Sequence, residues 1–513
     1  MIAVKYSPSQ LDFFNNVEAM MNGNGVKNIL LSAVAGSGKT FSIVESTRYL
    51  PRHCKARFFA FNKSIATELQ NKLPRTIQVS TVHSFGMQLM RESLKCSIKV
   101  DQFKHWKPIE EAIKQAGIEF DTKAKKNAFV FNMMKLIDMF RVNLMEFTGN
   151  ATVDRKMVSL LASTYSVELS PDNYTVMLLA WRRISDYNDI ILRGKQKEIT
   201  IDFVDMIYIP VVYSSRFNFP SHDIVYADEA QDLSVCQQSL IRLAIGDGKA
   251  VYVGDPRQSI YSFCGADSSS WRKLETAKNT VQLTLPVCYR CAVNVVNKAR
   301  TVYDHIQPFD GQVDGEVIES GDVFEAVEGD FILCRNTRPL VSLWYLLVAD
   351  GKRVVVKGDE DKRELLKLSQ KYAGESVTDA FNGMAMDLAK LAEHLVNSGV
   401  EKPREHRKYI EFAEMVECLK VIVDSSNSRS MVDVAAKIEA IFSDDSSDKL
   451  ILMTMHKSKG LESNNVYIVM PSLLPSKWAK TDVEIEQEKN LEYVAYTRAK
   501  MKLVIDRTWK YKY

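Results

Sequence analysis

The stretch Ala33-Val34-Ala35-Gly36-Ser37-Gly38-Lys39-Thr40 decides the fold class of this 513-residue chain. It follows the apolar run Asn28–Ser32, which indicates a buried strand, and it opens a segment, Lys39–Tyr49, that is typical of a helix. A glycine-rich turn at this point directs backbone N–H groups toward one place at a helix N-terminus, where anions are favoured. The pattern therefore predicts a phosphate-binding loop, with an ordinary Gly/Ser turn between a strand and a helix as the alternative.

Each part of this loop has an expected task. The backbone from Ala35 through Gly36, Ser37 and Gly38 surrounds the phosphates, while Lys39 reaches the β- and γ-phosphates. The Thr40 hydroxyl is expected to bind Mg²⁺. The loop thus predicts that ATP and Mg²⁺ are the cofactors.

Composition sets broad limits on the class of protein. The length suggests about three or four domains, and a hydrophobic content of 46% is typical of globular proteins. No run of about 18 apolar residues predicts a membrane span, and the N-terminus lacks the pattern of a secretion signal. We therefore expect a cytoplasmic location, at the nucleoid or, for a viral protein, in the host cytoplasm. A net charge of +3 does not by itself indicate a nucleic-acid partner, so any basic groove must come from local arrangement.

The eight cysteines are scattered along the chain. Cys288 and Cys291 form one C-x-x-C, but no second pair stands at a distance typical of zinc ligands. Free thiols in a reducing cytosol are favoured over a zinc site.

Several apolar segments end in polar or glycine-containing motifs, which is typical of strands in a parallel α/β sheet with sites at the carboxyl ends. They are Arg57–Phe61, Asp223–Ala227, Lys249–Val253, Leu450–Met453 and Val466–Met470. These strands form two clusters, divided at about residue 280. Residues 91–199 and 346–444 have helical patterns instead, and the Met and Phe side chains of Phe131–Phe140 are expected in a helical core. We therefore predict two α/β cores, each with a mostly helical insertion.

An acidic motif, Asp228-Glu229-Ala230-Gln231-Asp232, follows the strand Asp223–Ala227. Beside a phosphate loop, Asp228 is expected to hold Mg²⁺, and Glu229 to orient and deprotonate the water that attacks the γ-phosphate. A solvated acidic turn is the alternative.

The order of these and further motifs resembles that of superfamily 1 DNA helicases of the UvrD/Rep type. The matching segments are Gln10 in SPSQLDFF, AVAGSGKT, FNKSIATEL (Phe61–Leu69), STVHSFGMQLM (Ser80–Met90), DFVDM (Asp202–Met206), DEAQDLSVCQ, VGDPRQSIYSFCGA (Val253–Ala266), LPVCYRC (Leu285–Cys291), MTMHKSKGLE (Met453–Glu462) and VAYTRAK (Val494–Lys500). So many motifs in the same order make chance agreement negligible. The sequences of these motifs most resemble those of the F-box DNA helicase branch, although an F-box segment is not seen in this sequence.

The resemblance implies two RecA-like parallel-sheet domains of the P-loop NTPase class, with ATP between them. It implies a first domain at 1–90 and 200–280 with an insertion at 91–199, and a second at 281–345 and 445–513 with an insertion at 346–444. The implied catalytic residues are Lys39, Glu229, Gln258, Arg290 and Arg498, the two arginines acting as fingers on the γ-phosphate. Gln10 and Tyr289 would contact adenine and Glu462 the ribose. Without the motif context, each of these arginines would ordinarily form a surface ion pair. The tyrosine would ordinarily be an aromatic residue of the core.

The resemblance also implies DNA contacts on both domains. The implied residues are Phe61, Thr81, His83, Tyr261, Phe263, Thr454, His456 and Ser458. Aromatic rings stack on any base at about 1–3 kcal/mol each, which suits a motor that must tolerate every sequence. Hydrogen-bonded structural roles are the alternative for the two histidines.

The chain departs from the family pattern at several positions. Val34 and Cys264 stand where the family usually has glycine and arginine, and Phe263 replaces the usual tryptophan. Cys288 and Cys291 replace asparagine and serine beside the Tyr-Arg pair. The second insertion is shorter than usual, and neither a C-terminal tail nor a RecB-type nuclease domain is expected.

The leading hypothesis is an ATP-dependent 3′-to-5′ helicase and translocase on single-stranded DNA. Single strands and single-strand/duplex junctions are its expected partners, together with proteins of replication, recombination or repair, and a monomeric state is expected. One alternative is a translocase that displaces bound proteins with little unwinding. The others are a nucleotide-gated DNA-binding protein without turnover and an unrelated small-molecule kinase.

Overall fold

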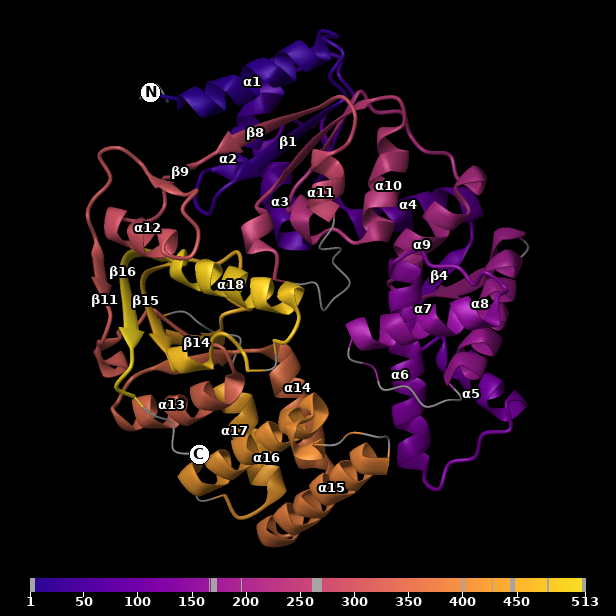
Figure 1. Cartoon of the computed structure of the whole chain (residues 1–513), viewed down its shortest axis with the longest axis vertical. Coiled ribbons are helices and arrows are strands. Elements are labelled where there is room, and N and C mark those ends of the chain that lie inside the picture. Colours follow the sequence, from indigo (N-terminus) through magenta and orange to yellow (C-terminus); the bar gives the residue numbers. More distant parts are fainter. Residues whose placement is uncertain are drawn as a thin grey trace. The chain divides into compact units, whose positions relative to one another are not determined.

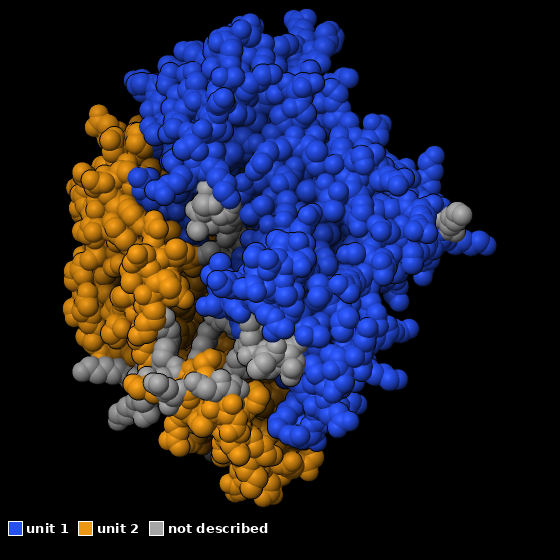
Figure 2. All heavy atoms as spheres, turned by 45° about the vertical axis from the view of Figure 1, so that its right-hand side comes forward, with its two compact units in different colours: residues 1–33, 38–285 blue, residues 34–37, 286–513 orange. Residues whose placement is uncertain are grey.

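The computed structural model describes residues 5–165, 167, 173–194, 196–260, 270–397, 400, 402–426, 428–442, 448–477 and 479–509 (Figure 1). Its contacts divide the chain into two units, coloured in Figure 2: Met1–Ala33 with Gly38–Leu285, and Val34–Ser37 with Pro286–Tyr513. Each unit contains a six-stranded sheet in which every pairing is parallel. The predicted α/β fold class with two parallel sheets is therefore confirmed.

The sheet of the first unit has the strand order β3-β2-β6-β7-β1-β8. The elements of this unit are α1 (Pro8–Met21), β1 (Asn28–Ala33), α2 (Lys39–Ser46), β2 (Ala56–Ala60), α3 (Lys63–Lys72), β3 (Gln78–Thr81), α4 (Val82–Leu94), β4 (Ser97–Val100), α5 (Trp106–Gln115), α6 (Lys123–Val142), α7 (Ala151–Thr164), α8 (Asn173–Leu192), β5 (Glu198–Ile201), α9 (Asp205–Val212), β6 (Ile224–Ala227), α10 (Val235–Ile245), β7 (Lys249–Gly254), α11 (Ser270–Glu275) and β8 (Thr280–Leu285). The helix predicted over Lys39–Tyr49 is α-helical only to Ser46, and a 3₁₀ turn continues it.

Both faces of this sheet are buried, as the apolar strand sequences require. Ile29 and Leu31 of β1 pack into one core cluster with α1 and α2, whereas Leu30 packs into the other with α4, α9 and α10. Successive side chains of a strand point to opposite faces, so one apolar run supplies both layers. Burial on both faces leaves the ends of the strands as the places where polar residues emerge.

The first insertion forms a separate helical core from α5, α6, α7 and α8. Met133, Ile137 and Phe140 of α6 are fully buried there, as predicted for Phe131–Phe140. Phe131 is an exception and is 50% exposed, because it lies outside the buried face of α6 and contacts the rings of Phe103 and Trp106 instead.

A buried ionic cluster joins this insertion to α9. The Arg141 guanidinium of α6 is fully buried and donates to both carboxylate oxygens of Asp202, at 3.1 and 2.7 Å, and to Asp205 at 2.7 Å. Lys104 also donates to Asp205, and His105 Nε2 lies 2.9 Å from Asp202.

The charges of this ionic cluster determine its protonation. Burial, together with the charge of Arg141, lowers the pKa of His105 to about 4, so its imidazole is neutral. His105, Asp202 and Asp205 are close enough to hold a metal ion, but Arg141 and Lys104 already neutralise the two carboxylates. We therefore interpret the group as an ionic link rather than a metal site.

The sheet of the second unit has the order β11-β16-β15-β12-β14-β13. Its elements are β9 (Val287–Cys288), α12 (Val293–Arg300), β10 (Gln307–Pro308), β11 (Glu316–Ile318), β12 (Phe331–Cys334), α13 (Thr337–Ala349), β13 (Val354–Lys357), α14 (Asp359–Lys371), α15 (Val377–Asn397), α16 (Arg407–Ser426), α17 (Met431–Ile441), β14 (Leu450–Thr454), β15 (Ser463–Val469), α18 (Asp482–Tyr496) and β16 (Ala499–Asp506). One core cluster packs α13, α14, α16 and α17 against this sheet.

Two strands extend the sheets beyond the segments expected from the sequence. β8 pairs with β1 in the first sheet, so that sheet continues to Leu285 rather than ending at about residue 280. β13 pairs with β14 in the second sheet, although it lies inside the segment expected to be a helical insertion. The helices of that insertion begin only at Asp359.

The longest helices in the described part of the chain are α6, α8 and α16, with 20 residues each, and α15, with 21. All four carry charged residues along their length. No helix among the described residues combines the length and the apolar character that a membrane span requires.

Candidate functional site

The glycine-rich loop lies between the carboxyl end of β1 and the start of α2. Gly36 and Gly38 have φ of +70° and +77°, a backbone conformation that side chains other than glycine rarely adopt. No side chain caps the N-terminus of α2, which leaves its first N–H groups available. The Ser37 hydroxyl is buried without a hydrogen-bond partner among the described residues. These features fit an anion in the loop.

Lys39, the first residue of α2, faces carboxylates that follow other strands. Its Nζ lies 2.9 Å from Glu229 Oε1, and the Glu229 N–H donates to Asp228 Oδ1 at 2.9 Å. Burial disfavours the charged form of Lys39, but the charges of Glu229 and Asp228 outweigh it and raise the pKa of the ammonium. Lys39 is therefore held as a cation.

Asp255 belongs to the same group, although the sequence analysis did not single it out. It follows β7 as Asp228 follows β6, and β7 lies between β6 and β1 in the sheet. Burial raises the pKa of Asp255, while Gln258 Nε2 donates to its Oδ2 at 2.7 Å. The signal that would have found it is an acidic residue directly after a buried strand.

Gln231 connects the two carboxylate positions. Its Nε2 donates to Glu229 Oε2 at 2.5 Å, and its Oε1 accepts the Asp255 N–H at 3.1 Å. A Cβ added to Gly254 would lie 2.1 Å from this Oε1, so only glycine leaves room for the amide. Gln231 thereby fixes the distance between the two strand ends.

Gln10 is placed beside the start of α2. It forms a capping box with Ser7 at the N-terminus of α1, and its Nε2 donates to the Ser42 hydroxyl at 3.1 Å. Its side chain is buried, and a Cβ added to Gly38 would lie 3.9 Å from its Nε2.

The second unit carries Tyr289 and Arg290 between β9 and α12. Within this unit the Tyr289 N–H donates to the Gly36 carbonyl at 2.9 Å. Tyr289 is half-buried, and its ring lies 5.0 Å from that of Phe309. Cys288 and Cys291 are buried free thiols, and the Cys291 N–H donates to Cys288 Sγ at 3.4 Å.

Both predicted arginine fingers have partners in this structure. Arg290 Nε lies 2.5 Å from Glu462 Oε2, and Lys500 Nζ lies 2.8 Å from the other oxygen of Glu462. Burial alone would raise the pKa of Glu462, but the hydrogen bond from Lys500 and the charge of Arg290 lower it. Arg498 is buried and donates to the carbonyls of Val494 and Leu461, at 2.9 and 3.2 Å.

Three of the predicted DNA contacts lie at one edge of the first sheet. Ala60, the last residue of β2, is in register with Thr81, the last of β3, so Phe61 emerges beside Thr81. Phe61 is 41% exposed, whereas burial lowers the pKa of His83. Thr81 is the N-cap of α4 and accepts the Ser84 N–H at 3.1 Å.

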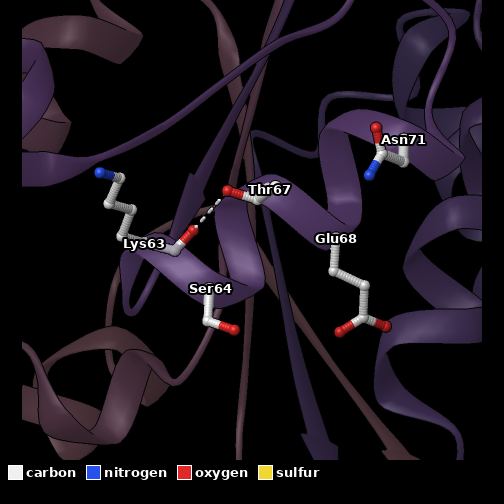
Figure 3. Close-up of a pocket in the computed structure, with 5 residues that line it drawn as sticks. All are labelled: Lys63, Ser64, Thr67, Glu68 and Asn71. Carbon is white, nitrogen blue, oxygen red and sulfur yellow. Dashed lines mark hydrogen bonds between the residues drawn. The ribbon is translucent and has the colours of Figure 1, made fainter.

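A shallow hollow lies on the adjacent helix α3, which begins two residues after Phe61 (Figure 3). Its lining residues are Lys63, Ser64, Thr67, Glu68 and Asn71. Ser64 and Glu68, one turn apart, point to the same side of the helix, and the Thr67 hydroxyl donates to the Lys63 carbonyl at 3.0 Å. The hollow is thus lined by residues with polar groups and is open to the surface rather than enclosed.

The remaining predicted contacts have different environments. Thr454 ends β14, and burial together with the charge of Arg335 lowers the pKa of His456 to about 3. Ser458 is fully buried and donates to the Met455 carbonyl at 2.7 Å, so its side chain stabilises a turn in this structure. Tyr261, Phe263 and the unusual Cys264 lie outside the described residues.

The loop, the uncapped helix and the carboxylates after the two adjacent strands define the P-loop class of nucleotide-binding proteins. A family model described as the UvrD/REP helicase N-terminal domain matches residues 16–279, just over half of the chain. The chain therefore belongs to the UvrD/REP helicase family.

Similar proteins include two F-box DNA helicases. F-box DNA helicase protein 1 of Schizosaccharomyces pombe is 24% identical over 96% of this chain and 56% of its own length. F-box DNA helicase 1 of Gallus gallus is 21% identical over 94% of this chain and 47% of its own. The chain thus spans about half the length of these relatives. The probable DNA helicase II homolog of Mycoplasma capricolum is 21% identical over 96% of this chain and 84% of its own length.

Proposed function

We propose that this chain is an ATP-dependent DNA helicase that moves 3′-to-5′ along single-stranded DNA and hydrolyses ATP to ADP and phosphate. The observation that carries the proposal is the contact of Lys39 with Glu229, beside Asp228 and Asp255, in a chain of this family. A cation and several carboxylates at the carboxyl ends of adjacent strands are what phosphoryl transfer requires.

The residues of the loop fit a nucleotide triphosphate and Mg²⁺. The open N–H groups of α2 and the buried Ser37 hydroxyl supply donors to phosphate oxygens. Thr40 and Asp228 would hold Mg²⁺, which neutralises charge on the phosphates. Glu229 would accept a proton from the attacking water, and this role requires Lys39 to exchange its contact with Glu229 for a phosphate.

The second unit would contribute positive charge and a stacking surface. We propose that Arg290 and Arg498 leave their present partners, Glu462 and the backbone carbonyls, to bind the γ-phosphate of the same nucleotide. A guanidinium offers a fixed fork of donors that matches phosphate oxygens. Tyr289 would stack on the adenine, Gln10 would hydrogen-bond its edge, and Glu462, once released, would contact the ribose.

The residues proposed to bind DNA range from exposed to buried. Phe61 and Thr81, adjacent at the sheet edge, suit stacking on a base and a contact to phosphate. His83 and His456 would act as neutral imidazoles, since burial lowers the pKa of each. Thr454 remains a proposed contact, and the burial of Ser458 favours a structural role for it.

We also propose four functional parts of the chain. The first core would comprise 1–90 and 200–285 with an insertion at 91–199, and the second 286–357 and 445–513 with an insertion at 358–444. The limits at 285 and 357 follow β8 and β13, which belong to the two sheets.

The test compares ATP hydrolysis with and without single-stranded DNA, and unwinding of duplexes with either a 3′ or a 5′ tail. We expect DNA to stimulate hydrolysis, only the 3′-tailed duplex to open, and Lys39→Ala to abolish both activities. Hydrolysis that is indifferent to DNA would contradict the proposal.

The same experiment distinguishes the alternative, a translocase that displaces proteins with little unwinding. A 3′-tailed duplex and a single strand carrying a streptavidin block are tested in parallel. Displacement of streptavidin without strand separation would support the alternative and overturn the helicase activity.

A further inference from the structure

Phe309 stands out among the exposed apolar residues of the second unit because of what its ring touches. It is 43% exposed, yet its ring centroid lies 5.0 Å from that of Tyr289, with the two planes at 44°. A single exposed phenylalanine is ordinary. A phenylalanine packed on the residue proposed to stack on adenine requires an explanation.

The backbone around Phe309 is fastened to the segment that carries Tyr289. β10 pairs with β9, and the Phe309 N–H donates to the Cys288 carbonyl at 3.2 Å. The Gln312 N–H donates to the Phe309 carbonyl at 3.0 Å, which closes a turn after the ring. The ring of Phe309 is therefore held at a defined place relative to Tyr289.

Gln312 fastens the same segment from its other end. Its side-chain Nε2 donates to the carbonyls of Tyr289 and Cys291, at 3.3 and 3.2 Å. The stretch 307–312 thus contacts both the backbone and the ring of Tyr289, and we call this stretch the brace.

We propose that Phe309 is a positioning residue for nucleotide binding, which fixes the ring of Tyr289 in the plane that receives the base. The inference rests on the proposed function, because it takes Tyr289 as the residue that stacks on adenine. A tyrosine without the brace would rotate about two side-chain bonds, and that freedom would be lost when the nucleotide binds. Fixing a side chain in its bound orientation improves affinity by reducing this loss.

The test measures KM for ATP and kcat, at saturating single-stranded DNA, for Phe309→Ala and Phe309→Tyr. An aromatic pair contributes enough to change an affinity about two- to tenfold. We expect Phe309→Ala to raise KM by this factor with kcat changed less than about twofold, and Phe309→Tyr to restore the parent KM. Val313→Ala, which removes an apolar side chain that is 52% exposed just beyond the brace, serves as the matched control and should leave KM unchanged.

A double-mutant cycle with Tyr289→Ala separates the inference from the proposed function. If Phe309 acts through Tyr289, Phe309→Ala has no further effect on KM in the Tyr289→Ala background. If Tyr289→Ala raises KM and Phe309→Ala does not, only the inference is overturned. If Tyr289→Ala leaves KM unchanged, the proposed adenine contact fails and the inference fails with it. If Phe309→Ala lowers kcat by the same factor as it raises KM, and does so also in the Tyr289→Ala background, its role is merely structural. That result would overturn the inference.

Discussion

Replacing Arg141 with methionine tests how the first insertion is joined to its core. Methionine replaces the aliphatic stem of arginine but lacks the charged guanidinium, so Asp202 and Asp205 would remain buried and lose their principal partner. Removing one member of a buried ion pair costs about 3–5 kcal/mol, and Lys104 and His105 only partly compensate. We expect the free energy of unfolding of the first unit to fall by about this amount, which corresponds to a melting temperature lower by about 10 °C.

The loss should depend on pH in a defined direction. In the parent, burial would raise the pKa of Asp202, but the charge of Arg141 outweighs it and lowers the pKa, so this stabilisation is present above the unfolded value of about 3.9 and disappears below it. In the variant, burial without the guanidinium raises the pKa of Asp202, which then takes up a proton as the pH falls. The difference in the free energy of unfolding between parent and variant is therefore largest near neutral pH and becomes smaller toward pH 5.

Urea unfolding at pH 7.5 and 5, with hydrogen exchange of peptides from α6 and α9, measures this difference. Arg183→Met is the control, because Arg183 is more exposed and lies 3.6 Å from its partner Glu111. Its expected cost is below about 1 kcal/mol. The reasoning would be refuted if Arg141→Met lowered the free energy of unfolding no more than the control does. It would also be refuted if the decrease were the same at both pH values.

Three further variants test the candidate site. Glu229→Gln should retain ATP binding in an equilibrium assay and lower kcat by about 100-fold or more, as expected for loss of a general base, and parent-like turnover would exclude this role. Gly254→Ala forces its Cβ against Gln231 and should cost about 1–3 kcal/mol in urea unfolding and also lower kcat, whereas Gly374→Ala, which meets nothing within 4 Å, should do neither. Thr81→Ala removes the N-cap of α4 and should cost about 1 kcal/mol and weaken stimulation by DNA, while Thr81→Ser should restore both; failure of serine to do so would contradict the capping role.

Much of the fold was predictable because buried parallel strands have nearly continuous apolar sequences. The run at Asn28–Ala33 has no polar alternation, and β6 and β7 of the same sheet are equally apolar, so strands and parallel sheets followed from pattern alone. β13 was missed because Val354–Lys357 is short and stands between helical segments, and only its pairing with β14 makes it a strand of the sheet. Phe131 was placed in the core because apolar content was counted without the helical face.

The candidate site was predictable where a motif requires particular residues in sequence, as at Lys39 and Glu229. Whether they act as predicted stays a prediction, but their contact follows from strands that the sequence made recognisable. The environments of Arg290 and Phe309 were not predictable. Their partners, Glu462 and Tyr289, depend on side-chain packing between segments that are not adjacent in sequence.

The backbone at Glu229 has a consequence for which residues this position accepts. Its φ of +49° and ψ of +44° place it in the left-handed region, which costs a non-glycine residue about 1–3 kcal/mol. Asparagine, aspartate and glycine adopt this conformation most readily, and none of them retains a carboxylate at the reach of a glutamate. Replacements that relax the main chain therefore lose the carboxylate or, for aspartate, shorten its reach, while valine or isoleucine would be excluded on backbone grounds alone. At this position stability favours residues that readily adopt the left-handed backbone, whereas catalysis favours glutamate. The glutamate would therefore be retained in evolution only while selection for ATP hydrolysis continues.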